Sequence, residues 1–178
     1  FWNPDRCCLY DVVDGEKKDD SIRPNQIYAV SLPYTMLPEN QAAAVVETVE
    51  KQLLAGPGIR SLSPEHTDYH GIYCGSLPKR DAAYHQGTAW GYLMGGFITA
   101  CLKVHDYSDE AKKQALEFLE PVKQHLYEGC IGSISEIFDG DEPHNCRGCY
   151  AQAWSVGEIL RCYQECMNSE KFNNIVEI

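Results

Sequence analysis

The chain has 178 residues, of which 44% are hydrophobic, and a formal net charge of -11 at pH 7. This length suits one ordinary domain, so we predict a single domain over residues 1–178. The acidic charge argues against nucleic-acid binding, which needs clustered Lys and Arg, and no run approaches the roughly 18 apolar residues of a membrane span.

The sequence opens on Phe1, with neither a starting Met nor the regions of a signal peptide, so we expect it to begin inside a longer protein. Its nine cysteines are an odd number without an evident pairing framework, which predicts free thiols and a cytoplasmic location. The alternative is a zinc-stabilised interaction domain that uses Cys146, Cys149, Cys162 and Cys166, because two close cysteine pairs can form a tetrahedral site. We favour structural thiols, since such cysteines are often small buried hydrophobes.

Hydrophobic periodicity predicts helices along most of the chain. A short helical piece is expected at residues 25–32. It precedes an amphipathic helix that Pro38 opens and Gly56-Pro57 ends. The apolar stripe of this helix follows the i, i+3, i+4, i+7 spacing and comprises Ala42, Val45, Val46, Val49 and Leu53.

Three further helices are expected downstream. The first has glycines instead of charges opposite its apolar face, so it should be buried on most sides; its face comprises Trp90, Leu93, Met94, Phe97, Ile98 and Cys101. The next is capped by Ser108, kinked by Pro121 and stopped by Gly129. The last starts near Tyr150, and one of its faces carries Ala153, Val156, Leu160 and Tyr163.

Two long polar connections, residues 56–84 and 130–149, separate these helices, and strand-like runs are confined mainly to residues 8–13 and 71–74. Long loops that hold aromatic, charged and glycine residues together favour function over disorder. Carboxylates and amides beside aromatic rings are typical of a sugar pocket, because flat rings pack on pyranose faces and planar side chains hydrogen-bond hydroxyls. The alternative is that these polar groups only satisfy neighbouring backbone.

Six segments along the chain form distinctive motifs. They are Arg23-Pro24-Asn25-Gln26, Gly58-Ile59-Arg60-Ser61-Leu62-Ser63-Pro64, Tyr69-His70-Gly71, Arg80-Asp81-Ala82-Ala83-Tyr84-His85-Gln86-Gly87, Gly132-Ser133-Ile134-Ser135-Glu136-Ile137-Phe138-Asp139-Gly140 and Arg147-Gly148-Cys149-Tyr150-Ala151-Gln152-Ala153-Trp154-Ser155. In this order they resemble the signatures of the glycogen debranching enzyme C-terminal (amylo-alpha-1,6-glucosidase) family. The resemblance runs from about Cys8 to Arg161, and the six motifs are highly specific as a set.

The resemblance implies an all-α fold, the (α/α)6 toroid of the helical glycoside hydrolases, of which this chain is expected to be the C-terminal part. It also implies an inverting hydrolase that removes the single α-1,6-linked glucose left at a branch point of glycogen or another branched α-glucan, without a metal or organic cofactor. Inversion needs an acid and a base on carboxyl groups roughly 6.5–9.5 Å apart. The family pattern assigns the base to Glu136.

The same motifs supply the candidates for sugar contacts, namely Arg80, Asp81, Tyr84, His85, Gln86, Trp90, Asp139, Asp141 and Gln152. Structural alternatives accompany them: Arg80 and Asp81 can pair with each other, His85 can cap a turn, and Trp90 can pack in the core. Asp139 or Asp141 is next in line if Glu136 is not the base.

The family's general acid belongs to an upstream Asp-containing motif, and we find no such motif in this sequence. We therefore expect the chain to need the upstream half of the same polypeptide, without which apolar helix faces would be uncovered. Two alternatives stay open. One is a non-catalytic α-glucan-binding module of the same fold, and the other is a related helical-toroid glycosidase of different linkage.

Overall fold

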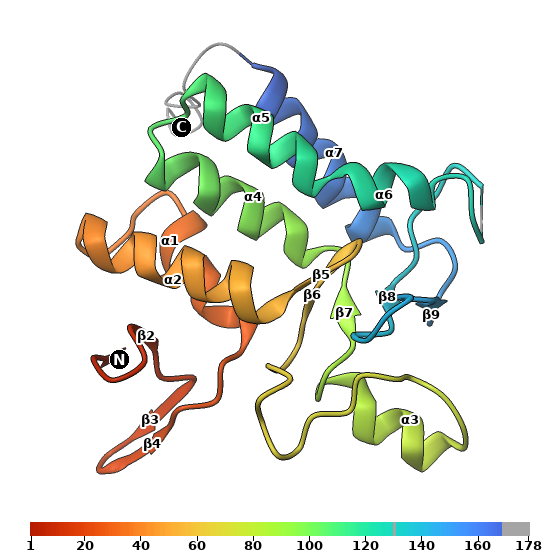
Figure 1. Ribbon diagram of the computed structural model, residues 1–178, viewed down its shortest axis with the longest axis horizontal. Coiled ribbons are helices and arrows are strands. Elements are labelled where there is room, and N and C mark those ends of the chain that lie inside the picture. Colours follow the sequence, from red (N-terminus) through yellow and green to blue (C-terminus); the bar gives the residue numbers. More distant parts are fainter. Residues whose placement is uncertain (130, 169–178) are drawn as a thin grey trace.

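Helices and short strands share the fold, and this corrects the predicted all-α (α/α)6 toroid (Figure 1). The computed structural model describes residues 1–129 and 131–168. Five strands form an antiparallel sheet in the order β5 (Leu54–Ala55), β6 (Gly58–Arg60), β7 (Ala89–Trp90), β8 (Ile137–Phe138) and β9 (Cys146–Arg147). Two antiparallel pairs lie nearer the N-terminus, namely β1 (Trp2–Asn3) with β2 (Cys8–Leu9) and β3 (Val12–Asp14) with β4 (Lys17–Asp19).

The sheet lies largely inside segments that the sequence predicts as loops. Its strands have two or three residues each, whereas alternation of apolar and polar residues becomes recognisable only over about four to eight. Strand β6 falls in the connection at 56–84, and β8 and β9 fall in the connection at 130–149. The run at 71–74 is not a strand, while the run at 8–13 contains β2 and the start of β3.

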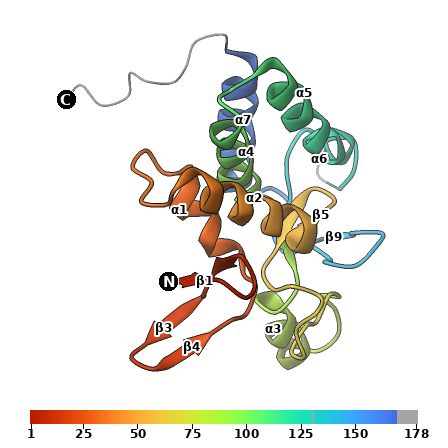
Figure 2. The same ribbon diagram turned by 60° about the vertical axis from the view of Figure 1, so that its left-hand side comes forward.

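Most helices lie together on one side of the sheet, and α3 lies apart from them on the other (Figures 1 and 2). The helical elements are the 3-10 helix η1 (Pro24–Ile27), α1 (Tyr28–Ser31), α2 (Glu39–Leu53), α3 (Leu77–Tyr84), α4 (Leu93–Val104), α5 (Asp109–Phe118), α6 (Glu120–His125) and α7 (Ala153–Met167). Residues 25–32 are therefore mainly helical, as predicted.

Helices α2 and α4 form the centre of the core. The predicted stripe of α2 is confirmed, because all five of its apolar residues are buried. Helix α4 contacts α1, α2, α5 and α7, and every residue from Leu93 to Leu102 is buried, as expected for a helix without a charged face. Trp90 does not belong to this helix: it lies in β7, which pairs on both sides with neighbouring strands.

The expected helix from Ser108 to Gly129 is two helices. The hydroxyl of Ser108 accepts a hydrogen bond from the amide of Ala111 at 3.2 Å and caps α5, as predicted. Helix α5 ends at Phe118, and α6 begins at Glu120 with Pro121 in its first turn, where the missing proline N–H costs no helical hydrogen bond. The proline therefore starts a new helix instead of kinking a continuous one.

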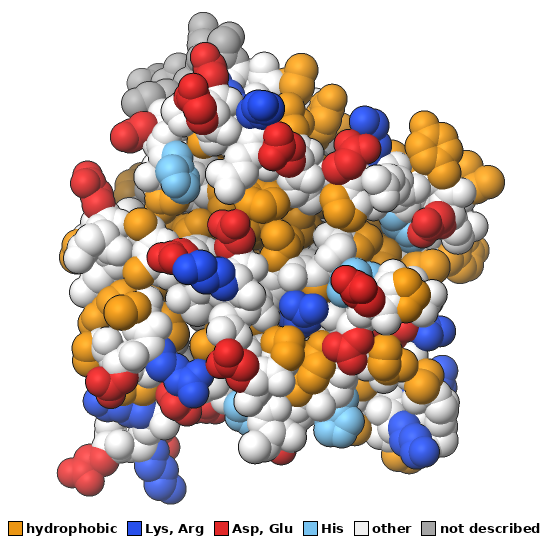
Figure 3. Space-filling model, viewed as in Figure 1, with side chains coloured by type: hydrophobic (Ala, Val, Ile, Leu, Met, Phe, Trp, Pro, Cys, Tyr) orange, Lys and Arg blue, Asp and Glu red, His pale blue; other side chains and the backbone are white. Residues whose placement is uncertain are grey.

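Helix α7 buries a face of mixed polarity, comprising Ser155, Cys162, Glu165 and Cys166, and turns an apolar stripe outward. Its buried Glu165 accepts hydrogen bonds from Thr99 of α4 at 2.7 Å and from Arg161 at 3.0 Å. The outward stripe consists of Val156, Leu160, Tyr163 and Met167, which are 38–61% exposed. Hydrophobic side chains are visible at the surface in this region in Figure 3. No helix among the described residues is long and apolar enough to cross a membrane.

Candidate active site

The central sheet brings Glu136 beside residues from two distant segments. Glu136 immediately precedes β8, and its amide donates to the carbonyl of Cys149, just after β9, at 2.8 Å. The amide of Cys149 in turn donates to Oε2 of Glu136 at 2.9 Å. The hydroxyl of Tyr84, the last residue of α3, donates to Oε1 at 2.6 Å. Both oxygens of this carboxylate therefore accept hydrogen bonds from fixed donors.

Gly148 permits the close approach of the Glu136 carboxylate to the backbone after β9. Its φ is +66°, and a Cβ added there would lie 2.5 Å from Oε2 of Glu136. A side chain at this position would be strained and would displace the carboxylate. Close packing against the Glu136 carboxylate therefore explains the glycine in the Arg-Gly-Cys segment, and the motif alone does not reveal this packing.

Tyr84 is held by its backbone and by neighbouring rings. Its carbonyl accepts hydrogen bonds from the hydroxyl of Thr88 at 2.5 Å and from Nε1 of Trp90 at 3.2 Å. Its ring packs on those of Tyr73, His85 and Trp90, with centroids 4.8–5.7 Å apart. Burial, and then the hydrogen bond to Glu136, raises the pKa of Tyr84 well above its usual value, so this hydroxyl keeps its proton.

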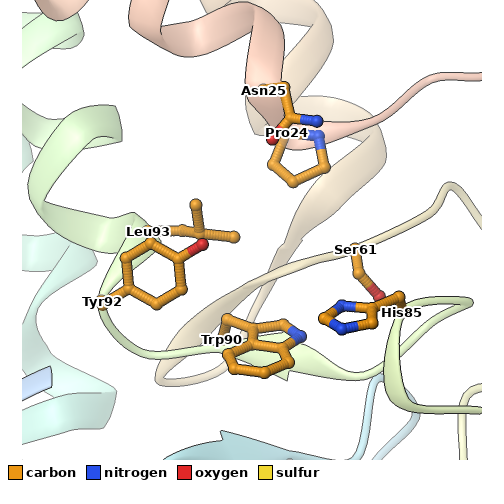
Figure 4. Close-up of a pocket in the computed structure, with 7 residues that line it drawn as sticks. All are labelled: Pro24, Asn25, Ser61, His85, Trp90, Tyr92 and Leu93. Carbon is orange, nitrogen blue, oxygen red and sulfur yellow. The ribbon is translucent and has the colours of Figure 1, made fainter. Parts of the chain in front are cut away.

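A small pocket of about 90 Å³ lies next to Tyr84 and is lined by Pro24, Asn25, Ser61, His85, Trp90, Tyr92 and Leu93 (Figure 4). The rings of His85 and Trp90 are nearly parallel, at 2°, with centroids 5.2 Å apart. Figure 4 shows them along one side of the pocket, across from Pro24 and Asn25. Trp90 is only 4% exposed, so it serves as a pocket wall and as a core residue at once.

Asp139 lies one residue past β8 and does not line this pocket. Its carboxylate is fully buried and accepts from Arg147 through Nη2 at 2.8 Å and Nε at 3.1 Å. It also accepts from the amide of Tyr73 at 2.8 Å. The hydrogen bond to this carboxylate raises the pKa of Arg147. Through these hydrogen bonds Asp139 links β9 to the segment after Gly71.

Asp141 is exposed and accepts a hydrogen bond from the hydroxyl of Tyr69 at 2.8 Å. Burial, followed by this hydrogen bond, raises the pKa of Tyr69 to about 12. The neighbouring carbonyl of Gly140 accepts from Nε of Arg60 at 2.8 Å. Asp141 therefore ties the Tyr-His-Gly motif to the loop after β8.

Arg23 fixes the segment that carries His85 and Gln86. Its guanidinium donates to the carbonyl of His85 at 2.8 Å, to Oε1 of Gln86 at 2.6 Å and to the carbonyl of Ser61 at 3.0 Å. The side-chain oxygen of Gln86 is thus engaged within the protein, whereas the imidazole of His85 borders the pocket.

The remaining candidates make none of these contacts. Arg80 and Asp81 belong to α3, where Asp81 is exposed. Nε of Arg80 is buried and has no hydrogen-bond partner among the described residues. Gln152 precedes α7; its amide donates to the carbonyl of Ile134 at 2.9 Å, and its side chain does not cap the helix.

The zinc alternative finds no support in the described part of the chain, which contains no group of three or more His, Cys, Asp or Glu side chains placed to hold a metal ion. Cys162 and Cys166 are buried on α7, and burial raises the pKa of the Cys162 thiol to about 12. A metal needs the thiolate, which burial disfavours. Cys149 is exposed and its thiol donates to the carbonyl of Ala151.

Sequence reasoning missed several groups that build the site. The Cys149 amide, the Arg23 guanidinium, and the pocket residues Asn25, Ser61 and Tyr92 were not among the candidates. A signal existed for Arg23, which opens a family motif, but its contact with His85 spans 62 positions. Spacing in the sequence does not reveal such a contact, and a backbone amide has no residue-type signature.

Comparison with known proteins identifies the family of this chain. The sequence model of the family described as amylo-alpha-1,6-glucosidase matches residues 1–161. The glycogen debranching enzyme of Saccharomyces cerevisiae is 32% identical over 169 residues, which cover 83% of this chain and 11% of that protein. The chain therefore spans about a tenth of the length of this curated relative. By its match over residues 1–161, the chain belongs to the amylo-alpha-1,6-glucosidase family.

Proposed function

We propose that this chain carries the catalytic base of an inverting glycoside hydrolase that removes the single α-1,6-linked glucose at glycogen branch points. The observation that supports it most directly is the Glu136 carboxylate, held by Tyr84 and by the Cys149 amide, in a member of the amylo-alpha-1,6-glucosidase family. The Tyr84 ring packs on His85 and Trp90, which line the aromatic pocket. The relative from yeast is named glycogen debranching enzyme.

In this mechanism Glu136 takes a proton from water as the water oxygen attacks the anomeric carbon. The competing carboxylates are less suited to that role. Asp139 is fully buried and doubly paired with Arg147, so it has no access to water. Asp141 is exposed and bonded to Tyr69, outside the set of rings around Tyr84. We therefore keep Glu136 as the proposed base.

We assign sugar contacts to residues of the pocket and its rim. The volume of about 90 Å³ is well below the roughly 300–1,000 Å³ of a complete ligand pocket, so we propose that this pocket holds only part of the sugar. His85 and Trp90 would present ring surface to the sugar, and Tyr92 and Asn25 polar groups. Arg80, Asp81 and Gln152 stay proposed as outer contacts, and Gln86 as a contact through its amide nitrogen.

The general acid and the rest of the sugar site are proposed to come from the upstream half of the same polypeptide. Two observations support this. The chain spans about a tenth of the yeast relative, and the outward stripe of α7 leaves Leu160 and Met167 exposed by 57% and 61%. An apolar stripe of this kind is typical of a helix that packs against a further layer. We place the activity in the cytoplasm, where free cysteines stay reduced.

The test is glucose release from an α-1,6-glucosyl-branched limit dextrin by the full-length protein that carries this chain. Glu136→Gln keeps the size and hydrogen bonding of the side chain but removes the base. We expect this variant to bind dextrin and to lose turnover by about 100-fold or more. The matched control is Glu120→Gln, which removes a carboxylate from an exposed pair with Lys123 and should keep wild-type turnover.

Three outcomes contradict the proposal. A wild-type protein that binds dextrin but releases no glucose is a glucan-binding module. Full activity of the Glu136→Gln variant places the base elsewhere. Activity on dextrins of other linkages, with none on the α-1,6 branch, points instead to a related glycosidase of different specificity.

A further inference from the structure

The carboxylate of Glu136 is bracketed by two donors of different kinds. The Cys149 amide on Oε2 is part of the backbone, in the same strand-like pairing that joins the Glu136 amide to the Cys149 carbonyl. The donor on Oε1, Tyr84, is a side chain that comes from α3, 52 positions away in the sequence. The backbone fixes one oxygen, so the rotation of the carboxyl plane about that point depends on the Tyr84 hydroxyl.

The hydroxyl of Tyr84 is well suited to fix that rotation. Its carbonyl is anchored by Thr88 and Trp90, and its ring is enclosed by those of Tyr73, His85 and Trp90. A phenol anchored in this way cannot follow the carboxylate if the carboxylate turns. The O–O distance of 2.6 Å is typical of a charge-assisted hydrogen bond.

We propose that Tyr84 is a positioning residue for the base of this hydrolase, and this proposal rests on the function proposed above. Each carboxylate oxygen has two lone-pair directions, so one direction on each oxygen stays free when Tyr84 and the Cys149 amide occupy the other. Tyr84 thereby presents a free direction of Oε1 to the attacking water.

Tyr84 undergoes no chemical change in the hydrolysis step. An O–H bond of water breaks and its proton passes to Glu136, while the water oxygen bonds to the anomeric carbon. The bond from that carbon to the departing glycosidic oxygen breaks, and this oxygen takes a proton from the general acid. Tyr84 donates the same hydrogen bond before and after the step, which distinguishes it from a catalytic residue.

The chain offers a matched control for the loss of this hydroxyl. Tyr107 donates to Oε1 of Glu165 at 3.0 Å, and its ring is also partly buried. The pair joins the end of α4 to α7 and lies outside the pocket. Tyr107→Phe therefore removes the same kind of tyrosine-to-glutamate hydrogen bond without touching the proposed base.

The experiment compares Tyr84→Phe, Tyr107→Phe and Glu136→Gln with wild type in the full-length protein, by glucose release at a series of concentrations of the branched limit dextrin, which gives kcat and KM separately. For Tyr84→Phe we expect kcat to fall about 10- to 100-fold, as for the loss of one hydrogen bond to a charged group, with KM within about twofold. Tyr107→Phe should keep both kcat and KM.

The outcomes separate this proposal from the function on which it rests. A Tyr84→Phe variant that raises KM at unchanged kcat makes Tyr84 a sugar contact and overturns the positioning role. So does an equal loss of kcat in Tyr107→Phe, which would make the effect one of general stability. In both cases wild type is active and Glu136→Gln is not. An inactive wild type, or an active Glu136→Gln, overturns the proposed function itself.

Discussion

The guanidinium of Arg147 donates to the carboxylate of Asp139 through Nη2 at 2.8 Å and Nε at 3.1 Å, and Asp139 is fully buried while the Arg147 side chain is 34% exposed. Because the pair joins β9 to the residue just after β8, it holds together the two strands that Glu136 precedes and Cys149 follows. The ion pair is thus part of the support for the proposed base.

Asp139→Asn should therefore act on stability first. We expect the free energy of unfolding to fall by about 3 kcal/mol, the lower end of the range for breaking a buried pair, because Arg147 is partly solvated. Urea unfolding measures this loss, and Glu120→Gln, from an exposed pair, should cost less than about 1 kcal/mol. An Asp139→Asn variant that is as stable as wild type but inactive would contradict this role and favour Asp139 as the base.

Tyr69 should make the protein sensitive to alkaline pH. Its pKa in the folded state is raised to about 12, above the value of about 10 for an unfolded tyrosine. A raised folded pKa contributes stability that is fully present below pH 10 and is lost as the pH rises toward 12. In Tyr69→Phe the free energy of unfolding should fall less steeply across this window.

The measurement is chemical unfolding at a series of pH values between neutral and 12. Tyr34→Phe, on a ring that is 82% exposed, is the control and should reproduce the wild-type curve. Equal slopes for wild type and Tyr69→Phe above pH 10 would show that Tyr69 is not linked to folding in the way its hydrogen bond to Asp141 indicates.

The sequence predicted the helices well where one face is apolar over three or more turns. The stripe of α2 and the burial of α4 follow directly from residue spacing, and Ser108 marks the start of α5. The strands were not predicted, because a run of two or three residues is too short to show an alternation of apolar and polar side chains. The row of paired positions Ile59, Trp90, Ile137 and Arg147 exists only once distant segments meet.

The candidate site was predictable in kind but not in arrangement. Motif resemblance singled out Glu136, Tyr84 and Asp139, yet it treated Tyr84 and Asp139 alike as sugar contacts. The structure separates them: Tyr84 donates a hydrogen bond to Glu136, whereas the buried carboxylate of Asp139 is paired with Arg147. Burial and hydrogen-bond partners distinguish these roles, and neither can be derived from residue type.

Gly140 should tolerate no side chain, because the loop after β8 passes directly against the backbone of Gly87. A Cβ at Gly140 would collide with the Gly87 carbonyl and lie 2.7 Å from the Tyr69 hydroxyl oxygen. We expect Gly140→Ala to lower the free energy of unfolding by about 1–3 kcal/mol, as for an overpacked core.

Gly157 provides the opposite control within α7, where an added Cβ meets nothing within 4 Å. Gly157→Ala should stabilise the protein by about 0.5–1 kcal/mol, because alanine is the better helix former. Thermal unfolding of both variants checks the pair. Stabilisation of both variants would contradict the close packing at Gly140.

The outward stripe of α7 should be covered in the full-length protein. Leu160 is 57% exposed in this chain, so Leu160→Lys should be nearly neutral if the stripe faces water and should destabilise by about 2 kcal/mol or more if it is buried. We expect destabilisation, measured by thermal unfolding of the full-length protein. Met36→Lys, at a residue 94% exposed, is the control and should change stability by less than about 0.5 kcal/mol.

Arg23 should control the binding of substrate through the segment that carries His85. Arg23→Lys keeps the charge but replaces a planar fork with a single ammonium group, which cannot reach the carbonyls of Ser61 and His85 and the amide of Gln86 in the same geometry. Because His85 lines the pocket, we expect KM for the branched dextrin to rise about tenfold, with a smaller change in kcat. Arg6→Lys, in an exposed pair with Asp20, is the matched control and should leave KM unchanged. If Arg23→Lys keeps the wild-type KM, the segment that carries His85 holds its position without the guanidinium group. The hydrogen bonds of Arg23 would then contribute nothing to the shape of the pocket.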